Sequence, residues 1–401
     1  MVSAIGIGKE ETLAALLAGR TGIGQMKYLP SCHNDLPVGE VPLSNEEMVQ
    51  KLGIADDVRY TRTALMGKLA LREALQEARL EGEALGEAHF ISATTVGGMD
   101  RRETYYEHEK DSDYTFACIA THHCGSCTEM VAEGLGTFAS MSTVSTACSS
   151  ATNAMITGAN MLRCGMADIV VVGGTESLTK FHLNGFNALM ILDAQQCRPF
   201  DRDRAGLNLG EGAAYLVLET AESVRKRGVK PLCALSGYGN ACDAFHQTAS
   251  SPDGEGAWLA MQEALQLAGL KPEDIVTVCW GDAVFASELP FKELLSQYDD
   301  IHDTFVAVAR DHYPYAWFDV DGEAVAKASF RKDDGDVPIG IHDQSLFGFR
   351  ARSMDLMNEY ISIPSVNEYK TLKYFEWLYD TRSSPAVCRF IAKDNVKSFN
   401  T

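Results

Sequence analysis

The sequence predicts an α/β fold built in layers, in which helices cover the faces of the sheets. Two observations lead to this prediction. Up to residue 279, short runs typical of strands alternate with longer runs of helical periodicity, which is the pattern of layered α/β domains. In addition, residues 71–80 (LREALQEARL) are echoed by residues 261–270 (MQEALQLAGL), and each run leads into a short strand-like segment. This internal echo indicates two related α/β halves.

The spacing of apolar residues predicts the helices. In residues 63–79, Leu65, Leu69, Leu71 and Leu75 recur among Lys, Arg and Glu, as expected of a helix with one buried face. The other expected helices are 9–18, 128–135, 149–164, 221–227, 255–268 and 353–360.

Runs of apolar and β-branched residues between turn-forming residues predict the strands. Residues 167–174 (ADIVVVGG) have the continuous apolar character of a buried strand. The other expected strands are 88–95, 141–146, 215–219, 232–239, 275–279 and 306–309. The proline-containing segment 31–43 is expected to be a loop, and the charged segment 100–114 is expected to be a surface excursion.

The most informative turn follows the expected strand at 141–146 and holds Cys148 among small residues, with a helix beginning at about residue 149. Free backbone N–H groups and the positive end of the helix dipole at such a place favour a thiolate. Ala147 and Ser149 leave room for a molecule to approach the sulfur. A nucleophilic cysteine can be built in this way, although a cysteine is also commonly a small buried apolar residue.

Composition excludes several classes of protein. The chain has 401 residues, 46% of them hydrophobic and 22% charged, which is typical of a globular protein with a large core. Its net charge of −20 and the lack of a basic stripe exclude a nucleic-acid-binding protein. The 11 cysteines are odd in number and show no spaced framework, which predicts reduced thiols and a cytoplasmic location.

The sequence predicts neither a cofactor nor a bound metal. The motif His122-His123-Cys124-x-x-Cys127 could suggest a metal site, but no second ligand cluster accompanies it. No signal peptide is indicated at the N-terminus. No apolar run approaches the ~20 residues that a membrane-spanning helix needs, so no membrane span is expected.

Four motifs occur in one order along the chain: residues 144–150 (VSTACSS), 198–201 (RPFD), 210–213 (GEGA) and 243–246 (DAFH). With this set of motifs the chain closely resembles, over residues 2–275, the β-ketoacyl synthases, the elongating condensing enzymes of fatty acid and polyketide synthesis. The resemblance implies a thiolase-like αβαβα fold made of two duplicated halves, the second incomplete or divergent here, and a homodimer.

The resemblance also implies a domain organisation. Residues 1–228 would form the N-terminal half with the nucleophile, and residues 229–279 would begin the C-terminal half. Residues 280–401 change in character and match no part of the family pattern. We expect this last segment to be divergent or unrelated.

The implied chemistry runs through Cys148, which would accept an acyl group from an acyl carrier protein as a thioester. Malonyl-acyl carrier protein would then lose carbon dioxide, and its carbanion would attack that thioester. Phe186 matches a family position lining the acyl pocket, and an ordinary core aromatic explains it equally well. His246 matches a histidine near the site that does not carry the condensation, and a structural histidine is an equal alternative.

The chain departs from the family pattern in three places. It begins partway into the first strand and turn, so a sheet would lose a strand. Trp280 stands about where the first of two family histidines belongs, and an indole can neither accept a hydrogen bond nor take up a proton. The later lysine, Gly-His and Gly-Phe-Gly-Gly motifs are not recognisable; residues 346–349 (LFGF) are a partial match.

These departures leave alternatives open. His302, His312 or His342 could substitute for the missing pair. The chain could also be a non-catalytic synthase-like subunit or remnant that binds acyl carrier protein or dimerises. A cysteine hydrolase pairing Cys148 with a histidine such as His312 is a third hypothesis, and the surrounding motifs fit it least.

Overall fold

The chain folds into two compact units, Met1–Leu235 (unit 1) and Ser236–Thr401 (unit 2). The structure is a computed structural model. It describes residues 1–55, 57–105, 116, 119–198, 204–246, 251–252, 254–270, 275–279, 283–285, 294, 297, 304–312, 316–330, 339–350, 370–381, 386–390 and 396–398.

Unit 1 is built on a six-stranded mixed sheet with the strand order β2-β1-β6-β5-β3-β4. Its central strand β5 pairs in parallel with β3 and antiparallel with β6. The strands are β1 (Val2–Ser3), β2 (Gly6–Ile7), β3 (His89–Ala93), β4 (Ser140–Val144), β5 (Ile169–Glu176) and β6 (Gly212–Glu219). The strands expected at 88–95, 141–146, 167–174 and 215–219 are therefore confirmed.

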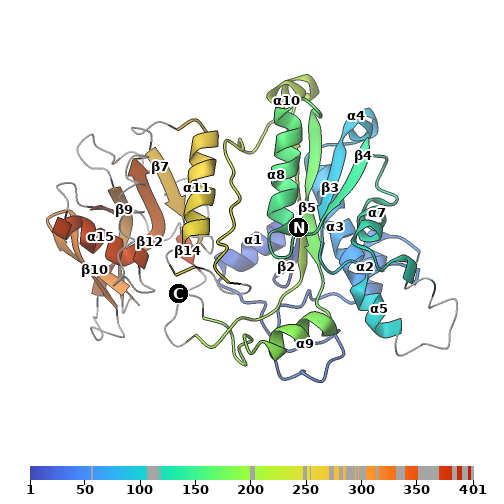
Figure 1. Cartoon of the computed structure of the whole chain (residues 1–401), viewed down its shortest axis with the longest axis horizontal. Helices are drawn as coiled ribbons and strands as arrows, with labels where there is room; N and C mark the ends of the chain where they lie inside the picture. The colour runs from blue at the N-terminus through green and yellow to red at the C-terminus, as the bar shows by residue number, and fades with distance from the viewer. Residues whose placement is uncertain are drawn as a thin grey trace. The chain divides into compact units, whose positions relative to one another are not determined.

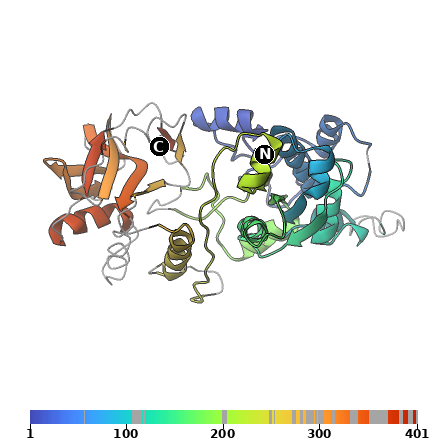
Figure 2. The same ribbon diagram turned by 90° about the horizontal axis from the view of Figure 1, so that it is seen from above.

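Helices cover both faces of this sheet (Figures 1 and 2). On one face, α2, α3 and α7 pack against β3, β5 and β6 in a core that includes Leu65, Phe90 and Tyr215. On the other face, Ala154 of α8 packs with Val170 and Val172 of β5. The helices of unit 1 are α1 (Lys9–Leu17), α2 (Asn45–Leu52), α3 (Arg62–Glu77), α4 (Gly82–Glu87), α5 (Met99–Tyr105), α7 (Cys124–Ala132), α8 (Ser150–Arg163), α9 (Lys180–Ala188) and α10 (Ala221–Arg227).

Local signals fix where several helices begin and end. The Thr61 hydroxyl accepts the N–H of Ala64 and starts α3, as N-cap residues do. Ser44 and Glu47 form a capping box at the start of α2. Helix α7 begins at Cys124 and ends at Ala132. The prediction of a helix at 128–135 therefore started too late, because the CGSC run at its beginning carries no apolar periodicity.

The prediction of a surface excursion over 100–114 was wrong for its first part. Residues Met99–Tyr105 form α5. The Asp100 carboxylate accepts the backbone N–H of Arg62, at 2.8 Å, and the Arg101 guanidinium donates to the carbonyl of Tyr60. These charged side chains form hydrogen bonds with backbone groups at the start of α3. A high content of charged residues therefore did not indicate a surface excursion here. Residues 106–115 lie outside the described residues.

Lys68 is an unusual core residue because its side chain is only 1% exposed on α3. Its ammonium donates to the Glu133 carbonyl and lies 5.5 Å from the centre of the Tyr60 ring. Burial lowers the pKa of Lys68 from 10.5 to about 8. The folded state therefore binds this proton less tightly than the unfolded state does.

The contribution of Lys68 to stability is accordingly expected to rise with pH between about 8 and 10.5, where this residue holds more of its proton in the unfolded chain. From pH 7.5 to 9.5, Lys68 should add on the order of 1–2 kcal/mol to the free energy of unfolding. Burial also raises the pKa of Tyr60 from 10 to about 12, so its titration opposes this gain once the pH approaches 10, where the unfolded tyrosine begins to lose its proton. Urea denaturation of wild type and Lys68→Met at both pH values checks this. An equal rise in the free energy of unfolding of the two proteins would contradict the role of Lys68.

Unit 2 contains a second sheet of six strands, with the order β10-β11-β13-β9-β12-β7. Its core gathers aromatic side chains, including Phe318, Phe347 and Phe375. Its helices and strands are α11 (Glu255–Leu267), β7 (Ile275–Cys279), β8 (Ala283–Phe285), β9 (Thr304–His312), β10 (Ala316–Asp321), β11 (Ala324–Phe330), β12 (Ile339–Arg350), α15 (Lys370–Thr381), β13 (Val387–Phe390) and β14 (Val396–Ser398). The predicted helix at 255–268 and strands at 275–279 and 306–309 are confirmed.

Strand β7, which belongs to the part of the chain that resembles the family, pairs antiparallel with β12. Strand β12 comes from residues 280–401, so chain segments on both sides of residue 280 share one sheet. The three-part division of the chain at residues 228 and 279 stays a prediction. The helix expected at 353–360 lies outside the described residues.

The strand predicted at 232–239 is not formed, and this prediction was wrong. The segment instead runs against α11. An added Cβ at Gly237 would lie 2.0 Å from the Ala264 carbonyl oxygen, and one at Gly239 would lie 2.0 Å from that of Ala260. The two glycines thus let the backbone touch the helix, where the pattern of apolar residues had suggested a sheet partner.

Candidate active site

The turn that carries Cys148 is held by small hydroxyl side chains. Ser150, the first residue of α8, donates from its Oγ to the Ala147 carbonyl at 2.6 Å, and the same Oγ accepts the Thr146 N–H at 2.8 Å. Ser149 donates to the Thr146 carbonyl at 2.8 Å. Asn153 of α8 donates to the Thr146 hydroxyl at 2.9 Å. Each bond ties the turn to the first turns of the helix that follows.

Ala147 takes up a left-handed conformation with φ of +52°, which is uncommon for a residue with a side chain and costs about 1 kcal/mol or more. The sharp bend leaves Cys148 exposed, two residues before the start of α8. The predicted placement of Cys148 at a strand-to-helix turn is therefore confirmed.

Cys148 lines a cavity of about 650 Å³ inside unit 1. Most of its walls are apolar or small residues from the ends of β3, β5 and β6, from the Cys148 turn and from α9. Phe186, on α9, lines the same cavity. The structure therefore brings together two of the three residues that the sequence singled out, and it places a largely apolar chamber beside the thiol.

The third residue, His246, belongs to unit 2, where it is exposed. It is not among the described residues that line the cavity, and its role stays a prediction. Trp280 and His302 lie outside the described residues, while His312 and His342 fall on β9 and β12 without described side chains. That His302, His312 or His342 substitutes for a missing family histidine also stays a prediction.

Sequence reasoning missed a histidine that does line the cavity. His182 lies in the first turn of α9, whose N-cap is Thr179. The Thr179 hydroxyl lies 2.8 Å from Nδ1 of this imidazole. A Thr-x-x-His spacing at the start of a helical run could have signalled it, because a residue three positions after an N-cap lies against the capping side chain.

Glu176 is the acidic group of the cavity wall, and its carboxylate is occupied by the loop that follows β3. It accepts the N–H of Val96 at 3.0 Å and the hydroxyl of Thr95 at 2.9 Å, together with the backbone N–H of Thr95 and the hydroxyl of Thr94. Glu176 thus fixes one wall of the cavity.

The Cys124 and Cys127 thiols of the possible metal motif lie on α7. Burial raises the pKa of both thiols, which disfavours the thiolate that a metal needs. Among the residues that the structure describes, no group of three or more His, Cys, Asp or Glu side chains is arranged to hold a metal ion.

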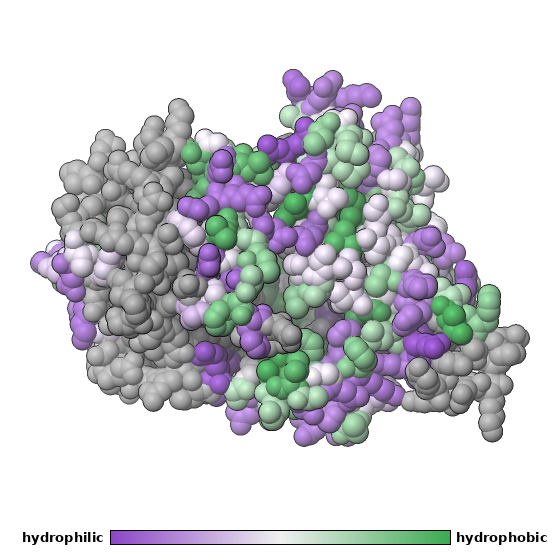
Figure 3. Space-filling view, in the orientation of Figure 1, coloured by the Kyte–Doolittle hydropathy of each residue, from purple (hydrophilic) through white to green (hydrophobic). Residues whose placement is uncertain are grey.

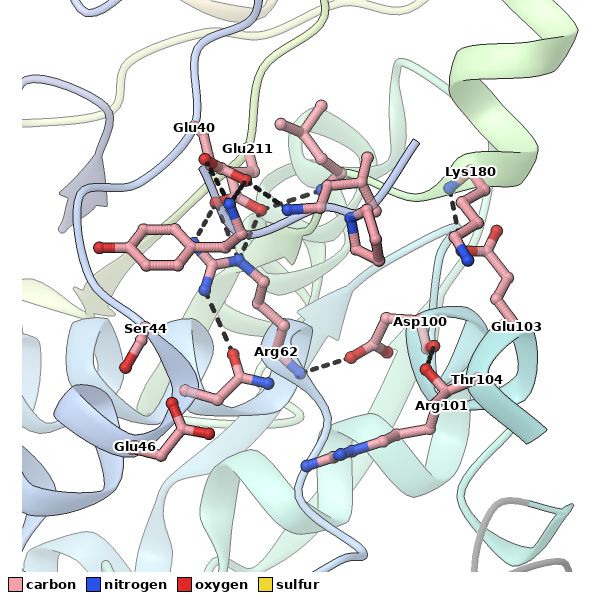
Figure 4. Close-up of a pocket in the computed structure, with 15 residues that line it drawn as sticks. Glu40, Ser44, Glu46, Arg62, Asp100, Arg101, Glu103, Thr104, Lys180 and Glu211 are labelled. Atoms are coloured by element: carbon pink, nitrogen blue, oxygen red, sulfur yellow. Dashed lines mark hydrogen bonds and ion pairs between the residues drawn. The ribbon is translucent and has the colours of Figure 1, made fainter. Parts of the chain in front are cut away.

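A second, smaller cavity of about 220 Å³ surrounds Arg62 and shows the role of the GEGA motif (Figure 4). Arg62 Nε donates to Oε1 and Oε2 of Glu211 at 2.9 and 3.0 Å, and the Glu211 side chain is fully buried. Glu211 also accepts the N–H groups of Val41 and Leu178, at 2.8 and 3.0 Å. Arg62 donates to the carbonyls of Val41 and Leu43. This motif residue therefore clamps the scaffold behind the Cys148 cavity.

The described part of the chain contains no helix that is long and apolar enough to cross a membrane. The nine cysteines whose side chains the structure describes, Cys148 among them, are free thiols.

Comparison with known proteins agrees with this site. The sequence profile of the β-ketoacyl synthase N-terminal domain matches residues 1–223, and that of the C-terminal domain matches residues 232–281. The 3-oxoacyl-[acyl-carrier-protein] synthase 2 of Staphylococcus aureus strain N315 is 30% identical over 290 residues, covering 68% of this chain and 69% of that protein. The synthase 2 of Rhizobium meliloti is 44% identical over 140 residues, and that match spans only 33% of each protein.

Solved structures give the same result. The ishigamide ketosynthase/chain length factor superposes with a TM-score of 0.61 at 30% identity, covering 68% of each chain. A ketosynthase in complex with its chain length factor from Xenorhabdus doucetiae has a TM-score of 0.54 at 25% identity, covering 68% of this chain and 67% of that one. With its profile match over more than half of its length, the chain belongs to the β-ketoacyl synthase family, the condensing acyltransferases of fatty acid and polyketide synthesis with a thiolase-like fold.

Proposed function

We propose that this chain transfers an acyl group from an acyl carrier protein to Cys148 and then condenses it with a malonyl unit. In the first step, the sulfur of Cys148 attacks the carbonyl carbon of the incoming thioester. A new carbon–sulfur bond forms, the bond to the carrier breaks, and the carrier thiol leaves with the proton of Cys148. The observation that carries this proposal is the exposed thiol on a braced turn beside a largely apolar cavity.

The cavity supports an acyl substrate. Its volume of about 650 Å³ lies within the range of ligand pockets, roughly 300–1,000 Å³. Ala151, Ala213 and Leu209 contribute to its apolar lining, and Phe186 offers an aromatic wall. Burying the methylene groups of an acyl chain there would contribute about 0.8 kcal/mol each. We infer that Phe186 packs against the acyl chain.

An acyl carrier protein is the proposed partner, and acyl and malonyl thioesters are the proposed substrates. The names of the relatives, 3-oxoacyl-[acyl-carrier-protein] synthase 2, include this carrier and support the choice. Exposed apolar side chains gather near α9 (Figure 3), among them Phe181, Leu189 and Met190. Because α9 also supplies Phe186 to the cavity, a carrier that delivers an acyl chain to Cys148 can pack on this surface. The free thiols support a cytoplasmic location.

We also infer a homodimer. Strand β4 lies at the edge of the unit 1 sheet, and Ser140, Met141 and Ser142 on it are exposed. An edge strand offers unpaired backbone groups that a second copy can pair with. Light scattering across a concentration series tests the dimer, and a mass equal to one chain at every concentration would contradict it.

A non-catalytic synthase-like subunit that binds acyl carrier protein is the second candidate. It is favoured by Trp280 at about the position of a family histidine, since an indole cannot accept a proton. Carrier binding without acyl transfer would identify this candidate.

Acyl transfer to the enzyme is the decisive measurement. We expect the wild-type protein, incubated with a saturated acyl-acyl carrier protein, to gain the mass of one acyl group, mapped by peptide analysis to Cys148. Carbon dioxide release from added malonyl-acyl carrier protein then reports the second step. Absence of any acyl mass would refute the acyltransferase proposal, whereas loading without carbon dioxide release would refute the condensation alone.

A further inference from the structure

The cavity beside Cys148 contains few titratable side chains, and they differ in what they can offer a substrate. Cys148, Glu176 and His182 line it. Glu176 already accepts four hydrogen bonds from residues 94–96. A carboxylate engaged in this way is poorly placed to serve a ligand. Apart from the nucleophile Cys148, His182 therefore is the titratable group of this cavity whose hydrogen-bonding capacity is not used up by the described residues.

The contacts of Thr179 limit how the ring of His182 can carry its proton. The Thr179 hydroxyl accepts the backbone N–H of His182 at 3.2 Å as the N-cap of α9. It has one hydrogen to donate, either to Nδ1 of His182 at 2.8 Å or to the sulfur of Met99 at 3.8 Å. Either the hydroxyl donates to Nδ1, or a proton on Nδ1 is donated to the hydroxyl, whose own hydrogen then turns to the Met99 sulfur.

With the Thr179 hydrogen donated to Nδ1, the neutral imidazole carries its own proton on Nε2. The structure shows no partner for Nε2 among the described residues. Thr179 is fully buried, so the ring is held from one side while its opposite nitrogen stays available. This arrangement suits a hydrogen-bond donor more than a base.

We propose that His182 donates a hydrogen bond from Nε2 to the thioester oxygen of the malonyl unit as that oxygen gains negative charge. This inference rests on the condensation proposed above. In that step the bond to the carboxylate carbon breaks, carbon dioxide leaves, and the electron pair spreads over the α-carbon and the thioester oxygen. The carbanion attacks the acyl carbonyl carbon and forms a carbon–carbon bond, the bond from that carbon to the Cys148 sulfur breaks, and the released thiolate takes up a proton from solvent.

A hydrogen-bond donor beside an oxygen that gains negative charge can contribute much to the rate. Removing one donor of this type costs about 10²–10³ in rate. His182 comes from unit 1 and from the same cavity as the nucleophile, so it acts without any contribution from the segment around Trp280. The structure thus supplies one donor at the site itself.

The test compares His182→Leu, which removes the donor at similar size, with His182→Gln, whose amide nitrogen restores a donor near Nε2. For each protein, the rate of acyl loading on Cys148 and the rate of carbon dioxide release from malonyl-acyl carrier protein are measured separately. We expect His182→Leu to load acyl groups at close to the wild-type rate and to release carbon dioxide about 10²–10³ more slowly. His182→Gln should recover roughly tenfold of that loss, as restored hydrogen bonds do.

Equal slowing of loading and carbon dioxide release in His182→Leu would overturn the proposal, because it would indicate a structural role. Unchanged carbon dioxide release would overturn it as well. A wild-type protein that neither loads acyl groups nor releases carbon dioxide would refute the condensation and this inference together. If His182→Leu unfolds, ¹⁵N NMR of labelled wild type still decides, since a proton on Nδ1 instead of Nε2 would contradict the donor role.

Discussion

Replacing Cys148 by alanine is expected to abolish acyl loading and to lower condensation by at least about 10³. The sulfur is the atom that bonds to the acyl carbon, and a methyl group cannot take its place. The fold should survive, because the Cys148 side chain is exposed and the turn is held by Ser149 and Ser150 instead. Intact mass after incubation with acyl-acyl carrier protein reads out loading directly.

Cys164 provides the matched control for this experiment. It is also an exposed free thiol, and it caps the other end of the same helix α8. Cys164→Ala should load an acyl group as the wild type does. Acyl mass remaining on Cys148→Ala and lost from Cys164→Ala would show that the wrong thiol has been assigned.

Replacing Glu211 by alanine is expected to lower the free energy of unfolding of unit 1 by about 3–5 kcal/mol. The change leaves the guanidinium of Arg62 buried without its ion-pair partner, and the Arg62 side chain is only 9% exposed. It also removes the acceptor of the Val41 and Leu178 N–H groups. Each buried donor left unpaired adds a penalty of its own. Urea denaturation at neutral pH measures the loss.

An exposed ion pair supplies the comparison. Asp57 and Arg59 lie 2.7 Å apart, with the Arg59 side chain 53% exposed. Because solvent screens such a pair, Asp57→Ala should lower the free energy of unfolding by less than about 1 kcal/mol. The loss of stability for Glu211→Gln should lie between the losses for Glu211→Ala and Asp57→Ala, because the amide oxygen of glutamine can still accept one N–H. Similar losses for Glu211→Ala and Asp57→Ala would contradict the clamp described for Glu211.

The sequence predicted best what depends on neighbouring residues. The strand at 141–146 and the helix at 149–164 are encoded by local patterns, and both form. The turn between the expected strand and helix therefore had only one place to be. Cys148 could be assigned to it because the small residues around it are contiguous in sequence.

What the sequence could not give depends on contacts between distant segments. Arg62 and Glu211 are separated by 149 residues, and no local pattern relates an arginine on α3 to the GEGA motif. The segment 232–239 has strand-like composition, yet its glycines pack on α11. The sequence did not single out His182, because its position beside Cys148 depends on the cavity that the fold creates.

The carboxylate of Glu176 has a thermodynamic consequence for whatever enters the cavity. By holding both the backbone and the hydroxyl groups of residues 94–96, it fixes one wall before a substrate arrives. The ligand then finds a surface that has little conformational entropy left to lose on binding. Preorganisation of this kind favours molecules that already match the shape of the cavity over those that would need it to adapt. The selection of acyl chains would thus be decided by the folded scaffold before any chemistry begins at the sulfur.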